Sequence, residues 1–441
     1  MAREMKNSGI KWIGDITNTW KLEKIKYSLK ERIEKNVPIK SKQILSLTAK
    51  QGVVLYENKI GAGNKPKEDF TAYKIARPND IVMNSMNILS GSVGLSSYFG
   101  CVSPVYYMLY SEGEYDIRYF YYIFKTNVFQ KSLFGLGNGI LIKESEKGTF
   151  NTIRMRIPMD KFGNLFIPIA SVKEQQNIAN YLDNKCSEID NLTADIEKQI
   201  SLLEDYKKSI ITEAVTKGLN PNVEMKNSGI EWIGKIPKHW IISKIKHIAK
   251  INPKCDIRKL NLDSVVTYSP MECIRNNVFE NRPINYEELP PSLTRFQEGD
   301  LVMAKVSPCF ENGNISIMKD LYSGVGFGSS ELFVFRSNPI TTRYLCYFLQ
   351  NTNCKNYEIL SFSGIAGLQR INSDHLRNTN ITIPNINEQK QIADYLDKKC
   401  SEIDSLISEK KKQLEKLSSY KQSMIYEYVT GKKEVPTQEI A

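Results

Sequence analysis

The sequence predicts a mixed α/β (α+β) protein, in which two strand-rich domains are separated by a long antiparallel coiled-coil pair with a pseudo-twofold internal repeat. Three observations lead to this fold class. Two phrases occur twice in the chain, a stretch of each repeat has a seven-residue hydrophobic period, and the segments between the repeated phrases alternate between apolar and polar residues as strands do. At 441 residues the chain is also long enough for two or more domains.

The internal repeat is carried by two phrases. MKNSGIKWIGDITNTW at residues 5–20 recurs as MKNSGIEWIGKIPKHW at residues 225–240, with 11 of 16 positions identical. EQQNIANYLDNKCSEIDNL at residues 174–192 recurs as EQKQIADYLDKKCSEIDSL at residues 388–406, with 14 of 19 positions identical. Matches of this length do not arise by chance, so the chain contains a duplication.

The segments between the repeated phrases, residues 21–166 and 241–382, show little resemblance to each other. This order makes physical sense if the repeated parts hold two modules in a fixed relation while each variable part recognises something different. The alternative is a plain duplication whose middle parts drifted. The predicted domains are an N-terminal anchor (1–20), a first variable domain (21–166), a central helix (167–220), a second anchor (221–240), a second variable domain (241–382) and a C-terminal helix and tail (383–441).

The repeated EQ phrases open two segments with coiled-coil character. Residues 174–216 contain no Gly or Pro, and an apolar residue recurs there every seven positions. The counterpart after residue 388 has a similar stripe, which Lys410 interrupts. The residues predicted to form the helix interface are Leu182, Ile189, Ile196, Leu203 and Ile210 in the first helix and Ile392, Leu396, Ile403 and Leu417 in the second.

Helix-ending signals bound both segments. Pro168 and Pro384 precede the helices, while Gly218 and Gly431 follow them. The first helix leads into the second variable domain and the second helix begins where that domain ends, so antiparallel pairing would return the chain towards its beginning. We expect the variable domains to lie at opposite ends of the helix pair.

Each variable domain contains strand-like phrases followed by polar loops. NDIVMN at residues 79–84 and GDLVMA at residues 299–304 occupy corresponding places and suggest a shared fold. The loops that follow are rich in amides, hydroxyls and cations, which are the groups that read base edges and hold phosphates. The residues predicted to bind DNA are Lys50, Asn84, Ser85, Asn87 and Lys143 in the first domain and Lys305, Asn312, Ser330 and Arg370 in the second.

Composition and charge narrow the class of protein. Sixty Lys and Arg residues against 49 Asp and Glu residues give a net charge of +11, which favours polyanionic partners. No apolar run reaches the roughly 20 residues that cross a bilayer, so no membrane association is expected. The eight cysteines include no CxxC pair, and the N-terminus lacks the apolar core of a signal peptide. We therefore expect a cytoplasmic protein with free thiols.

The sequence offers no catalytic or metal centre. It contains no Walker A pattern, no NPP-aromatic motif for amino methylation, and three histidines without metal-ligand spacing. We therefore predict no catalytic residues, no metal ligands and no cofactor bound by this chain.

Several phrases resemble those of one known family. SGIEWIGKIPKHW, the IP followed by EQ before each long helix, and YLDxKCSEID resemble the conserved regions of type I restriction-modification specificity subunits. AKVSPCFENGNIS and SGIAGLQRI resemble one class of target recognition domain, whereas LSLTAKQGV and SGSVGLSSYFGCVSPVY resemble another. Two classes imply two different half-sites.

The resemblance implies a non-catalytic, DNA-binding function. Each recognition domain would read one half of an interrupted double-stranded DNA target, and the helices would set the spacer. Two modification subunits would bring S-adenosylmethionine and methylate adenine, while two restriction subunits would use ATP and Mg to translocate and cut DNA. The alternative is a non-catalytic scaffold whose two basic modules bind protein or RNA partners.

Overall fold

The computed structural model contains two compact units, each with helices and strands. It describes residues 3–49, 51–60, 65–86, 91–139, 143–144, 150–151, 155–364 and 369–436. One unit comprises Met1–Asp195 with Lys412–Ala441, and the other comprises Ile196–Lys411. The mixed content and the division into two units agree with the predicted fold class.

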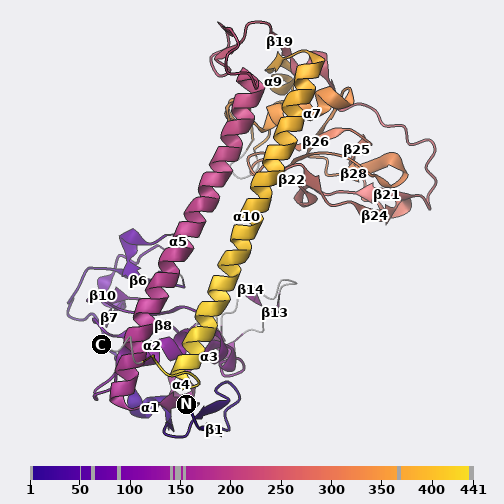
Figure 1. The fold of residues 1–441 in the computed structure, drawn as a ribbon. Coiled ribbons are helices and arrows are strands. Elements are labelled where there is room, and N and C mark those ends of the chain that lie inside the picture. The colour runs from indigo at the N-terminus through magenta and orange to yellow at the C-terminus, as the bar shows by residue number, and fades with distance from the viewer. Residues whose placement is uncertain are drawn as a thin grey trace. The chain divides into compact units, whose positions relative to one another are not determined.

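The two longest helices in the described part of the chain are α5 (Val172–Lys217) and α10 (Ile386–Val429) (Figure 1). Both begin close to the repeated EQ phrases, and the boundary between the units falls inside each helix. Among the described residues, no helix is long and apolar enough to cross a membrane.

The first unit is built around an antiparallel four-stranded sheet with strand order β4-β11-β8-β9. Leu109 in β11 pairs with Glu31 in β4 and with Ile81 in β8, and Ile81 also pairs with Leu95 in β9. The sheet strands are β4 (Lys30–Glu31), β8 (Ile81–Asn84), β9 (Val93–Leu95) and β11 (Tyr106–Tyr110), and the paired strands beside them are β5 (Leu45–Thr48), β6 (Gly52–Leu55), β7 (Lys74–Ala76) and β10 (Gly100–Val102).

Short helices and paired strands complete this unit. An aromatic core that includes Phe120, Phe124, Phe129 and Phe162 joins them to the sheet. These elements are β1 (Met5–Asn7), β2 (Asp15–Thr17), β3 (Lys21–Lys24), α1 (Ile25–Ser28), α2 (Ile117–Lys125), α3 (Asn127–Ser132), β12 (Asn138–Gly139), β13 (Lys143–Glu144), β14 (Phe150–Asn151), β15 (Met155–Arg156), α4 (Met159–Gly163) and β16 (Phe166–Ile169).

The second unit has a sheet of matching order, β20-β29-β26-β27, and a second four-stranded sheet of order β24-β21-β28-β25. The strands of the first sheet are β20 (Lys250–Ile251), β26 (Leu301–Ala304), β27 (Ile315–Ile317) and β29 (Leu332–Arg336), and those of the second are β21 (Val265–Tyr268), β24 (Arg282–Asn285), β25 (Thr294–Gln297) and β28 (Val325–Gly328). The remaining elements are β17 (Met225–Asn227), β18 (Lys235–Pro237), β19 (Ile241–Lys244), α6 (Ile245–Ile248), β22 (Ile274–Arg275), β23 (Val278–Phe279), α7 (Pro339–Gln350), α8 (Thr352–Ile359), α9 (Ser373–Asn378) and β30 (Asn380–Ile383).

Close packing in the second unit requires glycine in β28. A Cβ atom added at Gly326 would lie 2.0 Å from Cε2 of Phe296, whose ring is fully buried. Because a buried ring has no free volume to move into, only glycine lets the β28 backbone approach the β25 side chain this closely.

Within each unit, part of α5 packs against part of α10 in antiparallel fashion. In the first unit, Lys421 pairs with Asp190 at 2.6 Å and the rings of Tyr181 and Tyr428 lie 4.6 Å apart. From the first contact to the second, the residue number rises from 181 to 190 in α5 and falls from 428 to 421 in α10, so the two helices run antiparallel here.

The second unit has the equivalent helix contact with the roles of the helices exchanged. Lys207 of α5 pairs with Asp404 of α10 at 2.6 Å, and Lys410 donates to Gln199. Lys410, which interrupts the hydrophobic stripe, therefore makes a polar contact between the helices. Because this contact is exposed, the amine stays solvated and the interruption of the stripe carries little desolvation cost.

A buried carboxyl group in the second unit, that of Glu358, has a raised pKa. Glu358 of α8 accepts a hydrogen bond from the Thr379 hydroxyl through Oε1, while Oε2 has no partner among the described residues. Burial raises the pKa of Glu358 from 4.5 to about 7. The folded protein therefore keeps a proton that the unfolded chain releases, so this group lowers stability as the pH rises from about 4.5 to about 7.

We expect the variant E358Q to be more stable than the parent protein above pH 7, by about 1 to 3 kcal/mol, and to show little gain at pH 4.5. The physical reason is that glutamine has no charged form to desolvate. Thermal unfolding of both proteins at pH 5 and pH 8 measures the difference, and E197Q, which changes an exposed carboxylate of α5, is the control. An equal gain at both pH values would contradict the raised pKa.

Candidate nucleic-acid interface

Three of the predicted DNA-binding residues lie together in the second unit. Arg370 donates to Glu331 through Nε and Nη2, each at 2.9 Å, and the Lys305 amine donates to the carbonyl of Ser330 at 2.9 Å. Lys305 also lies over the ring of Phe333, 5.2 Å from its centroid. We call Lys305, Ser330, Glu331 and Arg370 the β26-end cluster, because Lys305 directly follows β26.

Backbone hydrogen bonds hold the β26-end cluster in place. The Lys305 amide donates to the Glu331 carbonyl, and the Ile371 amide donates to the Lys305 carbonyl, both at 2.9 Å. Arg370 and Ser363 exchange two further backbone hydrogen bonds, at 2.9 and 3.0 Å. The backbone of Arg370 is thus fixed before any ligand is bound, which reduces the entropy lost on binding.

The loop that follows Lys305 is compact and rigidly supported. Phe310 is buried against Phe362, and the buried Asn314 amide donates to the carbonyl of Met271 at 2.8 Å. Asn312 lies exposed on this loop, so the predicted residue is available to a ligand. Lys355 of α8, which the sequence analysis did not select, donates to the carbonyl of Glu311 behind the loop.

The charges of the β26-end cluster depend on one another. The hydrogen bond from Arg370 lowers the pKa of Glu331, and the same contact raises the pKa of Arg370. Burial lowers the pKa of Lys305, against the attraction of Glu331. The cluster holds two cations and one carboxylate, so it carries a net positive charge.

In the first unit the corresponding residues lie at the end of β8 and directly after it. Asn84 is half-buried, and its side-chain oxygen accepts a hydrogen bond from the Met86 amide at 3.0 Å. Ser85 is fully buried, and its hydroxyl donates to the Val105 carbonyl at 2.6 Å. The Ser85 hydroxyl therefore faces the protein and supports the loop, while the DNA-binding role of this residue stays a prediction.

Three other predicted residues of the first unit cannot be placed. Lys50 and Asn87 lie outside the described residues. The backbone of Lys143 forms part of β13, but its side chain also lies outside the described part of the structure.

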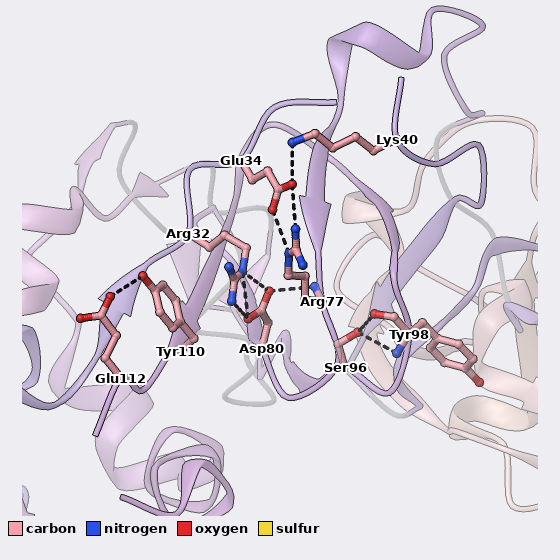
Figure 2. Close-up of polar contacts among 9 residues, drawn as sticks. All are labelled: Arg32, Glu34, Lys40, Arg77, Asp80, Ser96, Tyr98, Tyr110 and Glu112. Carbon is pink, nitrogen blue, oxygen red and sulfur yellow. Dashed lines mark hydrogen bonds and ion pairs between the residues drawn. The ribbon is translucent and has the colours of Figure 1, made fainter. Parts of the chain in front are cut away.

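At the opposite end of β8 a buried ion pair supports the sheet. Arg32 donates to both carboxylate oxygens of Asp80, the ring of Tyr110 covers its guanidinium at 4.3 Å, and the Arg77 amide donates to Asp80 (Figure 2). Figure 2 also shows Glu34, which accepts from Arg77 and Lys40 and whose pKa these contacts lower to about 2. These charges are paired with one another, so we assign them to structure and not to ligand binding.

Most of the predicted helix-interface residues are buried within their own units. Leu203 and Leu417 are half-buried. The fully or largely buried members are Leu182, Ile189, Ile196, Ile210, Ile392, Leu396 and Ile403.

A motif that the sequence analysis missed attaches the first variable domain to α5. RYxxY begins at Arg118 in α2, where Arg118 and Tyr122 donate to the two oxygens of Asp183 at 2.7 and 2.6 Å. The hydroxyl of Tyr119 donates to the carbonyls of Pro168 and Val429. The motif thus bonds the variable-domain helix α2 to α5, to strand β16 just before α5, and to the last residue of α10.

The same motif attaches the second variable domain to α10. Arg343 and Tyr347 of α7 donate to Asp397, and Tyr344 donates to the carbonyl of Val215. Asp183 and Asp397 both belong to the repeated YLDxK phrase. The sequence did contain a signal for these contacts, namely that RYxxY occurs in both of the otherwise different variable domains. Two helices that each donate to the equivalent aspartate of the repeat need the same donor side chains.

The described residues contain no group of histidine, cysteine, aspartate and glutamate side chains that could hold a metal ion. The cavity described in the first unit is lined by residues of mixed charge, among them Arg3 and Glu174, which pair with each other at 2.6 Å.

The comparisons with known proteins agree on one family. The model of the type I restriction modification DNA specificity domain matches residues 237–416. The MjaVIII specificity subunit of Methanocaldococcus jannaschii is 29% identical over 66% of this chain and 67% of its own length. The EcoEI specificity subunit of Escherichia coli is 32% identical over 36% of this chain, and the match spans 27% of that relative.

One solved structure supports the fold. A chain from a structure of the type I R-M system, described for its complex assembly and conformational transition, aligns with a TM-score of 0.67 over 95% of this chain and 99% of its own, at 11% identity. The chain is therefore similar, in its matched region and in its fold, to the specificity subunits of type I restriction-modification systems.

Proposed function

We propose that the chain is the DNA-specificity subunit of a type I restriction-modification complex, with residues 21–166 and 241–382 as two different target recognition domains. Each domain would read one half of an interrupted double-stranded DNA target. The observation that carries the proposal is the β26-end cluster, in which cations and exposed polar groups are held on fixed backbone beside a supported loop, in a chain similar to this family. Preorganised donors of this kind suit base-edge and phosphate contacts.

The repeated RYxxY contacts support a role for the helices in orienting the domains. We expect residues 167–220 and 383–441 to set the spacer between half-sites, and the anchors at residues 1–20 and 221–240 to help dock partners. By analogy with the family, the partners would be two modification subunits carrying S-adenosylmethionine and two restriction subunits using ATP and Mg, in the cytoplasm where the DNA lies. This chain would bind none of these cofactors.

A map of methylated adenines tests the proposal directly. In cells that express this chain with its modification subunit, we expect methylation at an interrupted two-part motif that is absent when the chain is omitted. Exchanging residues 21–166 for another recognition domain should change one half of the motif and leave the other half and the spacer intact. A soluble, co-purifying pair that produces no new methylation would contradict the proposal.

Salt dependence separates DNA recognition from the alternative of a scaffold for protein or RNA. Duplex binding by the assembled complex should weaken by about 10³-fold or more between 50 and 200 mM salt if it neutralises six or more phosphates. A sequence-specific component should persist at the higher salt. Binding to protein or RNA partners with no preference for the duplex motif would favour the scaffold.

A further inference from the structure

The pair formed by Arg370 and Glu331 uses only one side of the guanidinium group. Nε and Nη2 of Arg370 donate to the two carboxylate oxygens, each at 2.9 Å. No acceptor in the described part of the chain contacts Nη1, and the Arg370 side chain is 45% exposed. The terminal edge, formed by Nη1 and the outer hydrogen of Nη2, is therefore left with two parallel N–H donors.

The arginines with carboxylate partners include two groups, those that use the terminal edge in structural contacts and those that, like Arg77 and Arg258, form the same side-on pair as Arg370. All three nitrogens of Arg336 are engaged, by Asp300, the Lys254 carbonyl and the Cys255 thiol. The nitrogens of Arg118 are likewise shared between two aspartates. Arg336 and Arg118 complete structural contacts. Arg370 differs from the other side-on arginines because it lies in the β26-end cluster, beside Lys305 and the exposed loop that follows β26, with its backbone held by hydrogen bonds.

The chemistry of the free edge specifies its ligand. Two parallel N–H donors match the adjacent O6 and N7 acceptors on the major-groove edge of guanine. They could also bind two oxygens of a phosphate, but Glu331 already neutralises Arg370 and would lie close to that phosphate. The carboxylate of Glu331 would repel the phosphate but not the uncharged O6 and N7 acceptors of guanine. A guanine edge therefore suits the two Arg370 donors better than a phosphate does.

We propose that Arg370 reads a guanine in the half-site recognised by residues 241–382, and that Glu331 is a positioning residue that fixes the plane of the guanidinium. This inference rests on the proposed function. The backbone bonds of Arg370 to Ser363, and of Glu331 to Lys305, fix both ends of the pair. The reader is therefore in place before DNA arrives, and its two donors have a defined direction.

Binding of the purified complex with its modification subunit to defined duplexes tests the role of Arg370. The duplexes carry the mapped motif, with guanines of the second half-site replaced one at a time by 7-deazaguanine, which lacks the N7 acceptor. For the parent protein, we expect one replacement to weaken binding by about 10-fold or more. For R370Q, binding to the unmodified duplex should fall by about 10- to 100-fold, and that replacement should have no further effect.

The variant E331Q separates positioning from simple structural support. Loss of the carboxylate leaves Arg370 charged and less well oriented, so binding to random duplex at low salt should strengthen while preference for the motif falls. A structural defect would weaken both. R258Q is the matched control, because Arg258 forms the same side-on pair with Asp256 on the surface of the same unit.

Each outcome bears on the inference. If R370Q keeps its preference for guanine and instead loses about one phosphate from its salt dependence, Arg370 is a phosphate contact and the inference is wrong. A second half-site without guanine also overturns it, while the methylation map still supports the proposed function. Absence of any motif for the parent complex is a failure of the proposed function itself.

Discussion

Replacing Asp80 with alanine is expected to lower the free energy of unfolding of the first unit by about 3 to 5 kcal/mol. The Asp80 side chain is 1% exposed and accepts hydrogen bonds from Arg32 and from the amide of Arg77 (Figure 2). Its removal leaves the guanidinium of Arg32 half-buried beneath Tyr110 without a counter-charge. Breaking a buried pair in this way costs more than the pair itself contributes, because the remaining charge stays desolvated.

Hydrogen exchange followed by mass spectrometry is the suitable measurement for D80A, because it reports on the two units separately. We expect faster exchange in β4, β8 and β11 and little change in residues 241–382. E112Q is the control, since Glu112 forms an exposed pair with Lys30 that water screens, so its loss should have far less effect than that of Asp80. Equal effects of D80A and E112Q would show that burial does not determine the contribution of Asp80.

The variant D300A extends the test to the second unit. Asp300 precedes β26 as Asp80 precedes β8, and it is paired with Arg336 at 2.7 Å. It also accepts a hydrogen bond from the amide three residues earlier, as Asp80 does. We expect the increase in exchange to move to β26 and β29.

These two aspartates show what could be predicted from the sequence. The strand-like phrases NDIVMN and GDLVMA occupy corresponding places in the sequence, and the structure gives them the same place in sheets of matching order. The arginine partners could not be predicted, because they come from different strands. Arg32 follows β4 and Arg336 ends β29, so strand register, which depends on the whole fold, determines which guanidinium reaches each aspartate.

The same limit applies to the candidate site. Residue type was enough to select Lys305, Ser330 and Arg370, but not to show that they meet, since Arg370 reaches the end of β26 through an isolated bridge with Val306. Ser85 was selected for its hydroxyl, yet a hydroxyl also satisfies a buried carbonyl, and only the structure distinguishes the two uses. Glu331 was missed because a carboxylate is an unexpected neighbour in a site for a polyanion.

The second large effect is expected from truncating leucines that are buried where α5 and α10 pack against their units. The internal repeat supplies matched residues in the two helices for this test. Leu182 of α5 and Leu396 of α10 occupy equivalent places in the repeated phrase, and both are 0% exposed. We expect L182A and L396A each to cost about 2 to 5 kcal/mol, since truncation removes buried methyl groups and leaves a cavity in a well-packed contact. Urea denaturation, with hydrogen exchange to locate the loss, measures the effect.

Leu192 and Leu406 supply the control, because they lie in the same helices, are related by the same repeat, and are 49% and 47% exposed. L192A and L406A make the identical chemical change but remove side chains that already contact solvent, so each should cost less than about 1 kcal/mol. Helix propensity favours alanine slightly and acts equally on all four variants. If the four variants have similar stability, packing between α5 and α10 does not stabilise the units. If L182A and L396A alone are destabilised, and each loosens the unit that contains it, the buried stripe stabilises each unit through independent contacts.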